Sequence, residues 1–332
     1  HISPWNYPFQ LSIAPIIGAI AAGNTVLLKP SEYSEETSKL LKEIIINVFD
    51  EGFVSVGLGG PKIASKLLSF QWDYIFFTGS VNIGKIVAEK AAKFLTPTTL
   101  ELGGKNPCII DETVPVKTTA KRIIWGKFIN CGQTCIAPDF LIVSEKIVKK
   151  LTHELIIQIE VLYGKNPEES ESYGRIIGAK HLKYLKSLLE NQKIIHGGNI
   201  NTNNKYFEPT LIEIDNFDSK LMEDEIFGPI LPIYAYKDFN EIDEIIKKYK
   251  NPLALYIFTK KIGFGEKFLH KHSFGGGAIN DTVVHIINDR LPFGGIGNSG
   301  MGKYHGESTF KTFSHYKPYI SKPLWIDIPL RL

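Results

Sequence analysis

Over its first hundred residues, the sequence alternates short β-rich runs with helical stretches. This alternation limits the set of possible folds more than any other feature of the sequence. The strand-like runs lie at 25–29, 53–60 and 74–80, and the helical stretches between them lie at 35–48 and 61–69. Short turns that contain glycine separate them. A βαβαβ pattern of this kind predicts a doubly wound parallel sheet with helices on both faces. Ligands of such sheets bind at the carboxyl ends of the strands.

The pattern begins again after Pro107. A long amphipathic helix at about 116–130 is followed by a strand-like run at 140–144, and then by helices near 146–162 and 179–190. This second series predicts another α/β unit. From position 291 onward the chain is rich in glycine and then extended in character. We therefore expect one domain over 1–104, a second over 105–290, and a loop with a tail over 291–332.

The composition agrees with two folded domains and argues against nucleic-acid binding and against a membrane-spanning segment. The 332 residues are 43% hydrophobic and 22% charged, which is enough apolar material for a sizeable core. The 38 basic and 35 acidic side chains give a net charge of +3 without long runs of one sign, so the chain does not resemble a nucleic-acid-binding protein. The longest apolar stretch, at 11–22, contains Pro15 and is too short to span a bilayer.

Two of the three cysteines, Cys131 and Cys135, lie four residues apart at the end of the predicted helix. On a helix this spacing separates the Cβ atoms by roughly 5–6 Å. A disulfide requires about 3.5–4.5 Å, so the spacing disfavours one. A structural zinc site would need further Cys or His ligands close by, and the next histidine downstream is His153 in a helical stretch. We therefore expect no metal here.

Two interpretations of this pair remain open on residue type and spacing alone. Cys135 follows Gly132, where a helix can end and release backbone amides that could bind an oxyanion, so Cys135 could be a nucleophile. Alternatively both cysteines are small buried hydrophobic residues, and we assign Cys108 to that class. The odd number of cysteines in so long a chain favours a reducing compartment such as the cytoplasm.

Seven segments, in order from residue 4 to 306, resemble the aldehyde dehydrogenase family. The resemblance covers essentially the whole chain, and the last of the seven, with the "FKTFSHYKP" that follows it, is most similar to the class 3 branch, which includes the fatty aldehyde dehydrogenases. The segments are "PWNYPF", "LLKPSE", "FFTGSVNIG", "LELGGKNP", "NCGQTC", "EDEIFGPILP" and "LPFGGIGNSGMGKYHG".

The resemblance implies three catalytic residues. Cys135 ends the segment that matches the family's nucleophile motif, Glu101 lies in its glutamate motif, and Asn6 corresponds to its oxyanion-binding asparagine. A thiolate adds to an aldehyde carbon, and the resulting thioester needs a carboxylate to activate water. A glutamate between two leucines suits that role because partial burial raises its pKa. The alternatives are that Glu101 pairs with Lys105 and that Asn6 is only a turn residue.

The resemblance also implies a nicotinamide cofactor, with NAD preferred and NADP as the alternative. Gly79 and Ser80 end a strand-like run, and a helix that begins near Gly84 would turn its N-terminus toward pyrophosphate. Four further positions match residues that contact the two riboses and the nicotinamide ring. They are Lys29 and Glu32 at the adenosine end, and Glu225 and Phe227 at the nicotinamide end. The alternatives are an ion pair at a helix start capped by Ser31, and an acidic loop with a core phenylalanine.

On this resemblance, we expect a cofactor domain that lacks its beginning, a catalytic domain, and a C-terminal segment that joins an oligomerisation arm in a homodimer. The expected substrate is a medium-chain, long-chain or aromatic aldehyde. His305 is interpreted as a surface-loop histidine. Because the chain begins at His1, we expect it to be a piece of a longer protein, in which a membrane anchor could follow "LWIDIPLRL" and place the enzyme on the cytosolic face of a membrane. The rival functions are a cofactor-independent thioester hydrolase and a non-catalytic relative.

Overall fold

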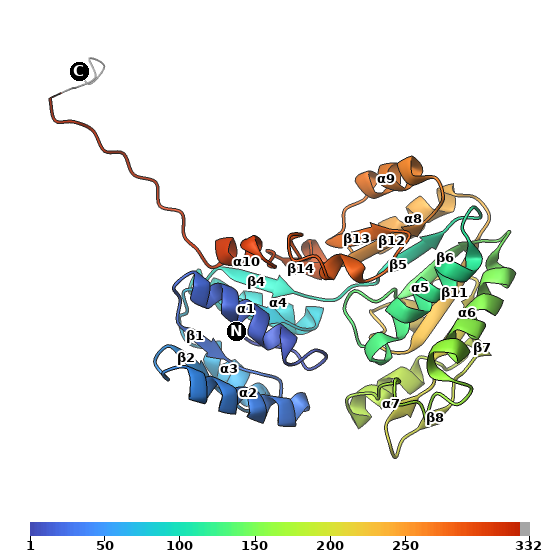
Figure 1. The fold of residues 1–332 in the computed structure, drawn as a ribbon, viewed down its shortest axis with the longest axis horizontal. Helices are drawn as coiled ribbons and strands as arrows, with labels where there is room; N and C mark the ends of the chain where they lie inside the picture. The colour runs from blue at the N-terminus through green and yellow to red at the C-terminus, as the bar shows by residue number, and fades with distance from the viewer. Residues whose placement is uncertain (326–332) are drawn as a thin grey trace.

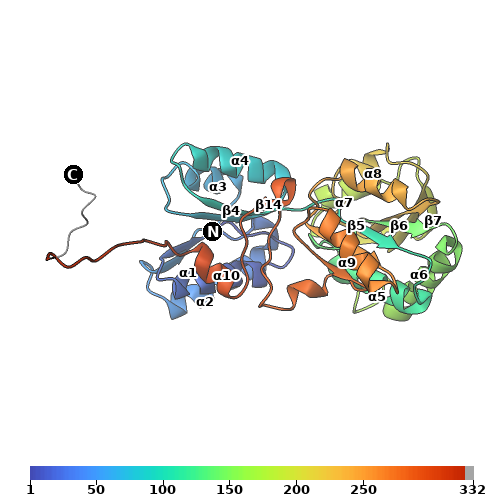
Figure 2. The same cartoon turned by 90° about the horizontal axis from the view of Figure 1, so that it is seen from above.

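The computed structural model describes residues 1–325, so the end of the predicted 291–332 segment, including most of "LWIDIPLRL", lies outside the described residues. The described chain forms two lobes side by side, with a tail that runs away from the first lobe (Figure 1). Figure 2 shows the same two lobes from above, joined by the chain between β4 and β5 and by the returning segment near β14. Within residues 1–325, no helix is long and apolar enough to cross a membrane.

The first lobe contains two small sheets that the start of the chain joins. Ile2 bridges to Lys29, just after the first sheet, and to Phe77 in the second, so residues 1–3 occupy the place of a middle strand. The pairs β1 with β2 and β3 with β4 are parallel, and β14 returns antiparallel to β4. The strands are β1 (Val26–Leu28), β2 (Val54–Val56), β3 (Ile75–Thr78), β4 (Thr98–Glu101) and β14 (Gly300–Met301).

Helices pack on these strands through apolar residues that are spaced one helical turn apart in the sequence. In α2, for example, Leu41 and Ile45 are fully buried against Leu28 of β1 and Val54 of β2, which fixes the helix on its strands. The helices of this lobe are α1 (Gln10–Ala21), the short η1 (Glu32–Ser34), α2 (Glu35–Val48), α3 (Pro61–Leu67), α4 (Val81–Ala92) and α10 (Glu307–Thr312).

The second lobe is built on a seven-stranded sheet in the order β13-β12-β5-β6-β11-β10-β7. All neighbours are parallel except β7, which lies antiparallel to β10 at one edge. Every residue of β6 and β12 is buried, as expected for strands covered on both faces. The strands are β5 (Pro107–Ile110), β6 (Phe140–Ser144), β7 (Lys193–His196), β10 (Thr210–Ile214), β11 (Ile230–Tyr236), β12 (Ala254–Phe258) and β13 (Gly276–Ile279).

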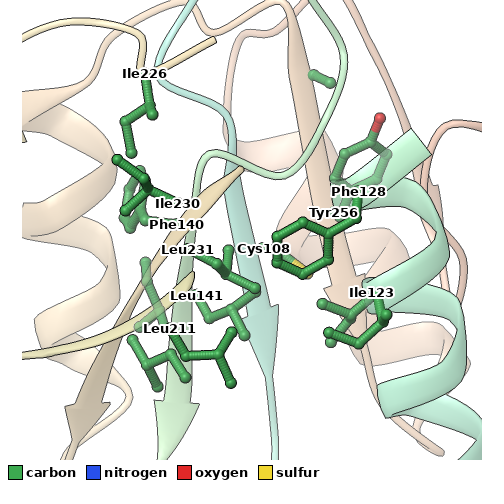
Figure 3. Close-up of a cluster of buried hydrophobic side chains, with 14 of the residues drawn as sticks. Cys108, Ile123, Phe128, Phe140, Leu141, Leu211, Ile226, Ile230, Leu231 and Tyr256 are labelled. Carbon is green, nitrogen blue, oxygen red and sulfur yellow. The ribbon is translucent and has the colours of Figure 1, made fainter. Parts of the chain in front are cut away.

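Helices pack on this sheet and complete the main core. Figure 3 shows the buried cluster in which Ile123 and Phe128 of α5 meet Cys108 of β5 and Tyr256 of β12. The predicted α/β fold with a parallel sheet is confirmed. The helices are α5 (Val116–Phe128), α6 (Val148–Tyr163), α7 (Ala179–Ser187), α8 (Asn240–Lys248) and α9 (Ile262–Lys271), with short η2 (Ile129–Gly132), η3 (Lys220–Met222), η4 (Val284–Ile286), η5 (Gly297–Ser299) and the hairpin β8 (Ile200–Asn201) and β9 (Tyr206–Phe207).

Candidate active site

Cys131 lies in the short helix η2, and Cys135 lies in the turn that follows it. The helix predicted over about 116–130 is confirmed as α5, which ends two residues early at Phe128. After it, Asn130, Cys131 and Gly132 all have positive φ angles, of 50°, 57° and 73°. A Cβ atom on Gly132 would lie 2.3 Å from the carbonyl oxygen of Gly228. Only glycine fits this position, because the chain there is both left-handed and in contact with another backbone segment.

The three cysteines are free and differ in exposure. Cys108 is fully buried in the sheet, as expected (Figure 3). Cys131 is also fully buried and contacts Tyr173, away from solvent. Cys135 is the one cysteine among residues 1–325 that keeps partial exposure. A nucleophile must be reachable by its substrate, so Cys135 is the only one of the three placed to act as one.

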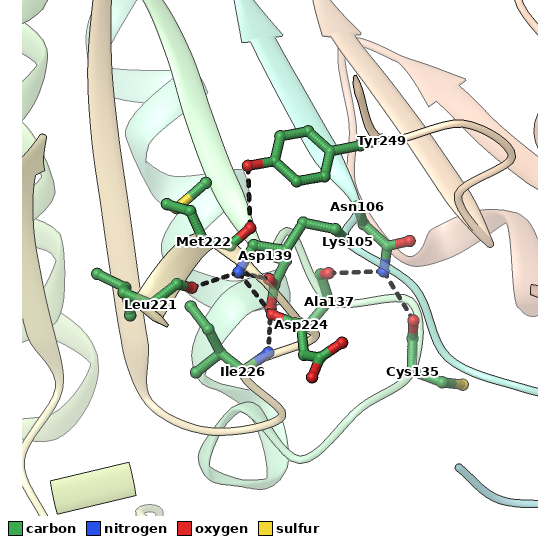
Figure 4. Close-up of polar contacts among 10 residues, drawn as sticks. All are labelled: Lys105, Asn106, Cys135, Ala137, Asp139, Leu221, Met222, Asp224, Ile226 and Tyr249. Atoms are coloured by element: carbon green, nitrogen blue, oxygen red, sulfur yellow. Dashed lines mark hydrogen bonds and ion pairs between the residues drawn. The ribbon is translucent and has the colours of Figure 1, made fainter. Parts of the chain in front are cut away.

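Asn106 fixes the backbone at Cys135 (Figure 4). Its side-chain amide donates to the carbonyl oxygens of Cys135 at 2.7 Å and Ala137 at 3.0 Å, and its own oxygen accepts from the backbone N–H of Ala254 at 2.8 Å. Sequence reasoning did not single out Asn106, although it lies within the quoted "LELGGKNP" segment. A buried asparagine that satisfies three backbone groups holds the loop in one conformation.

Asn6 from the first lobe reaches the same turn. Its side-chain amide donates to the carbonyl oxygen of Gln133 at 3.2 Å, and its own backbone oxygen accepts from the side chain of Asn130 at 2.8 Å. Next to it, the hydroxyls of Tyr7 and Thr134 lie 2.7 Å apart in a hydrogen bond. Since a side-chain amide has two hydrogens, Asn6 retains one that no described residue accepts.

Glu101 ends strand β4 as an enclosed carboxyl group. It is 3% exposed, and neither of its side-chain oxygens has a hydrogen-bond partner among residues 1–325. Burial raises the pKa of this carboxyl well above its usual value. An unpaired polar group that is this deeply buried is costly, and such groups are often found where a reaction needs them.

The alternative in which Glu101 pairs with Lys105 is wrong. The Lys105 ammonium lies 2.7 Å from Asp139 and donates to the carbonyl oxygens of Leu221 at 2.7 Å and Asp224 at 2.8 Å (Figure 4). The ammonium of Lys105 is therefore held by one ion pair and two hydrogen bonds, none of which involves Glu101. Lys105 therefore joins the segment after β4 to the 221–224 loop, and Glu101 forms no ion pair within residues 1–325.

The charges around Cys135 come from both lobes. The pKa of the Cys135 thiol is raised to about 12, mainly by burial and then by the nearby carboxylates of Glu225 and Glu101. The backbone N–H groups of Cys135 and Ile136 lower this pKa. Glu101 and Glu225 thus both lie within electrostatic reach of the sulfur. The structure brings together the predicted nucleophile, the predicted base and one predicted cofactor contact.

At the predicted adenosine end, Lys29 and Glu32 form an ion pair of 2.6 Å. Lys29 is almost completely buried, while about a third of the Glu32 side chain is exposed. Ser31 caps the short helix η1 by accepting from the backbone N–H of Tyr33 at 3.3 Å, so the proposed cap is present as well. One carboxylate oxygen of Glu32 binds Lys29, and the other is left for a ligand.

Gly79, Ser80 and Gly84 form the turn between β3 and α4. The prediction that this helix begins near Gly84 was wrong: α4 begins at Val81, and Gly84 makes the first helical hydrogen bond, to the carbonyl oxygen of Ser80. A Cβ atom on Gly84 would lie 2.5 Å from the side chain of Leu102, so this glycine allows α4 to pack closely on the end of β4. The free N–H groups of the first helical turn suit an anionic group such as a phosphate.

Glu225 and Phe227 lie on the loop before β11, facing the segment from the first lobe. A Cβ atom on Gly103 would lie 1.8 Å from a side-chain oxygen of Glu225, which places this carboxylate directly against the Gly103 backbone. Phe227 has a left-handed backbone with φ of 52°, and its ring meets that of Trp5 edge to face at 5.3 Å. The Nε2 atom of His181 lies 2.8 Å from the carbonyl oxygen of Phe227.

His305 is not the surface histidine that we expected. It is half-buried, its ring stacks on Phe293 at 5.3 Å, and it meets Tyr304 edge to face at 4.5 Å. The Tyr304 hydroxyl has a raised pKa, mainly because of burial and then because of the charges at Glu101 and Cys135. His305 thus lies beside a buried tyrosine whose hydroxyl is within electrostatic reach of Glu101 and Cys135. In the sequence, the signal for this placement was the aromatic residue directly before His305.

Known proteins share the sequence of this chain over nearly all of its length. Residues 1–318 match the model of the aldehyde dehydrogenase family. The chain is 46% identical to 4,4'-diaponeurosporen-aldehyde dehydrogenase of Staphylococcus aureus over 100% of its own length and 72% of that protein. It is 45% identical to aldehyde dehydrogenase family 3 member A2 of Pongo abelii, over 97% of this chain and 67% of that protein.

Solved structures give the same result. The substrate-bound state of Staphylococcus aureus AldH superposes with a TM-score of 0.97 at 45% identity, covering 100% of this chain and 73% of that one. An NAD-dependent aldehyde dehydrogenase from Sinorhizobium meliloti superposes with a TM-score of 0.88 at 27% identity, covering 98% and 67%. The chain therefore belongs to the aldehyde dehydrogenase family, with relatives in family 3, and is an oxidoreductase of that family.

Proposed function

We propose that this protein oxidises aldehydes to carboxylic acids through a thiohemiacetal and then a thioester on Cys135. The observation that supports this most directly is the enclosed carboxyl of Glu101, which has no partner among residues 1–325 and lies within electrostatic reach of the partly exposed Cys135. A carboxyl group in this position is suited to activate water against an ester of that sulfur.

In the first step the Cys135 thiolate adds to the aldehyde carbon and converts the carbonyl oxygen into an oxyanion. The uncommitted amide hydrogen of Asn6 and the backbone N–H of Cys135 are the donors for this oxyanion. The Asn106 side chain holds the Cys135 carbonyl and so fixes the direction of these groups. A bound nicotinamide supplies the acceptor for the hydride that leaves the tetrahedral carbon.

Glu101 acts in the second half of the reaction. Water attacks the thioester carbon while its proton passes to the Glu101 carboxylate, and the Cys135 thiolate leaves as the carboxylic acid forms. Because burial raises the pKa of Glu101, the carboxylate is a stronger base than an exposed glutamate. A proton on Glu101 blocks this step, so hydrolysis should become faster as pH rises through the raised pKa of Glu101.

The described residues fit a dinucleotide cofactor. The first turn of α4 offers free N–H groups beside Gly79, Glu32 keeps one free carboxylate oxygen, and Glu225 and Phe227 face the segment that carries Asn6. We propose that Glu32 and Lys29 bind the adenosine ribose, and that Glu225 and Phe227 contact the nicotinamide ribose and ring. Since the Lys29 ammonium is already paired with Glu32, a 2′-phosphate would meet a carboxylate, which favours NAD over NADP.

The substrate class and the assembly are also proposals. The names of relatives point to family 3 and to 4,4'-diaponeurosporen-aldehyde, and a rat relative that is 43% identical is named dimeric and NADP-preferring. We propose a medium-chain, long-chain or aromatic aldehyde, and a homodimer in which the tail contributes to the interface. Large apolar side chains of the tail, such as Tyr319, Ile320 and Trp325, are more than four-fifths exposed.

The free cysteines are consistent with a reducing compartment.

Steady-state assays of the full-length protein with a series of aldehydes test this function. With NAD present, NADH and carboxylic acid should form in equal amounts. Hydrolysis of acyl thioesters at a comparable rate without any nucleotide, combined with no NADH formation, would instead identify a cofactor-independent thioester hydrolase. Size-exclusion chromatography with light scattering on the same sample measures the subunit number.

A further inference from the structure

His181 is a half-buried histidine of the second lobe that the proposed mechanism does not use. It lies in the first turn of α7, and its Nε2 atom lies 2.8 Å from the carbonyl oxygen of Phe227 on the loop before β11. A carbonyl oxygen can only accept a hydrogen bond, so Nε2 carries a proton and donates it. The side chain is therefore directed at the backbone of a residue that we assign to the cofactor site.

Phe227 needs support of this kind because its backbone conformation is unusual. Its φ of 52° lies in the left-handed region, which residues with large side chains rarely adopt and which persists only where surrounding contacts hold it. A second contact comes one residue further along, where a Cβ atom on Gly228 would lie 2.5 Å from the side chain of Leu185. His181 and Leu185 are one helical turn apart, so one face of α7 holds this part of the loop.

The ring of Phe227 lies where the two lobes meet. It contacts the ring of Trp5 from the first lobe edge to face at 5.3 Å. Trp5 in turn meets the ring of His181 at 6.0 Å, and the rings of His181 and Phe227 are 6.3 Å apart. Three half-buried rings from three segments of the chain therefore pack together at the proposed nicotinamide end of the site.

We propose that His181 is a positioning residue for the cofactor: its Nε2–H group holds the Phe227 carbonyl and so keeps the Phe227 ring where it can pack beside the nicotinamide. This inference rests on the proposed role of Phe227. It gives a function to a histidine that lies outside all seven segments that resemble the family. His181 acts through Phe227 and takes no part in the chemistry at Cys135.

The test is NADH binding by the full-length protein, measured by nucleotide fluorescence without turnover. His181→Phe keeps a ring but has no N–H group, so the NADH dissociation constant should rise by about 3- to 10-fold, the usual effect of losing one hydrogen bond. His181→Gln can still donate from a similar reach and should bind NADH to within about twofold of the wild type. The matched control is His153→Phe at an exposed position of α6, which should leave binding unchanged.

A double-mutant cycle tests whether the Phe227 ring carries the effect. Phe227→Ala removes the ring but keeps the carbonyl oxygen that His181 binds. In this background, His181→Phe should change the NADH dissociation constant by less than about twofold, because no ring remains to be positioned.

Ester hydrolysis without nucleotide distinguishes this role from general damage to the site. The Cys135 thiolate can attack p-nitrophenyl acetate and release p-nitrophenolate, and water then hydrolyses the acetyl thioester to acetate with Glu101 as the base. No nicotinamide takes part in this sequence. His181→Phe should therefore hydrolyse the ester at a rate within about twofold of the wild type, although its NADH binding is weakened.

The outcomes separate this inference from the proposed cofactor site. If the wild type binds NADH and His181→Phe binds it equally well, the inference is overturned while the cofactor site stands. The inference is also overturned if His181→Gln binds as weakly as His181→Phe, if the loss is the same in the Phe227→Ala background, or if ester hydrolysis falls as much as binding. If the wild type does not bind NADH, or if Phe227→Ala binds it as tightly as the wild type, the proposed role of Phe227 fails and the inference fails with it. Should His181→Phe not fold, the smaller His181→Leu, which also lacks an N–H group, replaces it in each measurement with the same expected results.

Discussion

The two neighbouring cysteines have different surroundings, and this difference determines what each can do. Cys131 lies in the core beside Tyr173, whereas Cys135 is partly exposed and lies near two carboxylates. We predict that Cys135→Ala lowers the steady-state rate of aldehyde oxidation by at least about 1,000-fold, since no other group can form the thioester. Cys131→Ala should retain activity to within about threefold, because it removes only a buried sulfur.

The comparison depends on both variants being folded. Thermal unfolding followed by circular dichroism should therefore accompany the rate measurements, with Cys131→Ala expected to show the larger loss of stability because it leaves a cavity. Similar losses of activity in the two variants, at similar folded fractions, would show that the assignment of Cys135 is wrong.

Glu32 determines the choice between NAD and NADP in the proposed account. Its carboxylate pairs with Lys29 at 2.6 Å and would lie close to a 2′-phosphate, and such a like-charge contact costs on the order of a few kcal/mol when partly shielded from water. We predict that the ratio of kcat/KM for NAD to that for NADP exceeds 1 in the wild type and falls by about tenfold or more in Glu32→Gln. In that variant Lys29 is released from its ion pair and can bind the phosphate. A native preference for NADP, or an unchanged ratio in the variant, would contradict this role.

At the scale of helices and strands, the sequence predicted most elements because their periodicity reflects local packing. The predicted helix at 35–48 has the same ends as α2, and the strand-like run at 140–144 is strand β6. The helix predicted over 116–130 instead ends at Phe128, because Gly132 contacts the backbone of Gly228, a segment that is distant in sequence. A contact of that kind leaves no periodic signal.

The site was only partly predictable for the same reason. Cys135, Glu101 and Asn6 could be named from motifs, but the partners that position them come from across the fold. Asn106 binds the Cys135 backbone from 29 positions away, and Lys105 turned out to pair with Asp139 and not with Glu101.

The turn before Cys135 offers a test at this scale. Gly132 and Gly23 both have left-handed backbones, with φ of 73° and 82°, but a Cβ atom would meet a backbone carbonyl at Gly132 and nothing within 4 Å at Gly23. Gly23→Ala should therefore lower the free energy of unfolding by about 1 kcal/mol, the cost of the conformation alone. Gly132→Ala should lower it by at least about 3 kcal/mol and also reduce activity.

Urea denaturation of the two variants measures these free energies. The Gly23 variant is the matched control, because it shares the backbone conformation and lacks the contact. Equal losses of stability in both would show that the turn can move away from Gly228, and that the packing of the nucleophile turn against the 225–229 loop does not constrain it.

For the whole molecule, the essential feature is that the two lobes supply different parts of one site. Glu101 ends a strand of the first lobe and Asn6 precedes α1, whereas Cys135 lies just before β6 of the second lobe (Figure 1). Hydrogen bonds from Asn6 and Asn130 join the two sides. We therefore predict that Cys135 of the second lobe forms the thioester and that Glu101 of the first lobe promotes its hydrolysis.

Rapid-mixing kinetics on Glu101→Gln, with NAD and an aldehyde, test this claim most directly. Glutamine preserves the size of the side chain but cannot accept a proton, so formation of the thioester should proceed while its hydrolysis stops. We predict a burst that approaches one NADH per subunit, a steady-state rate reduced by at least about 100-fold, and an acyl group found on Cys135 by peptide mass mapping. A folded Glu101→Gln protein that shows no burst and no acylated Cys135, or that turns over at the wild-type rate, would contradict the account.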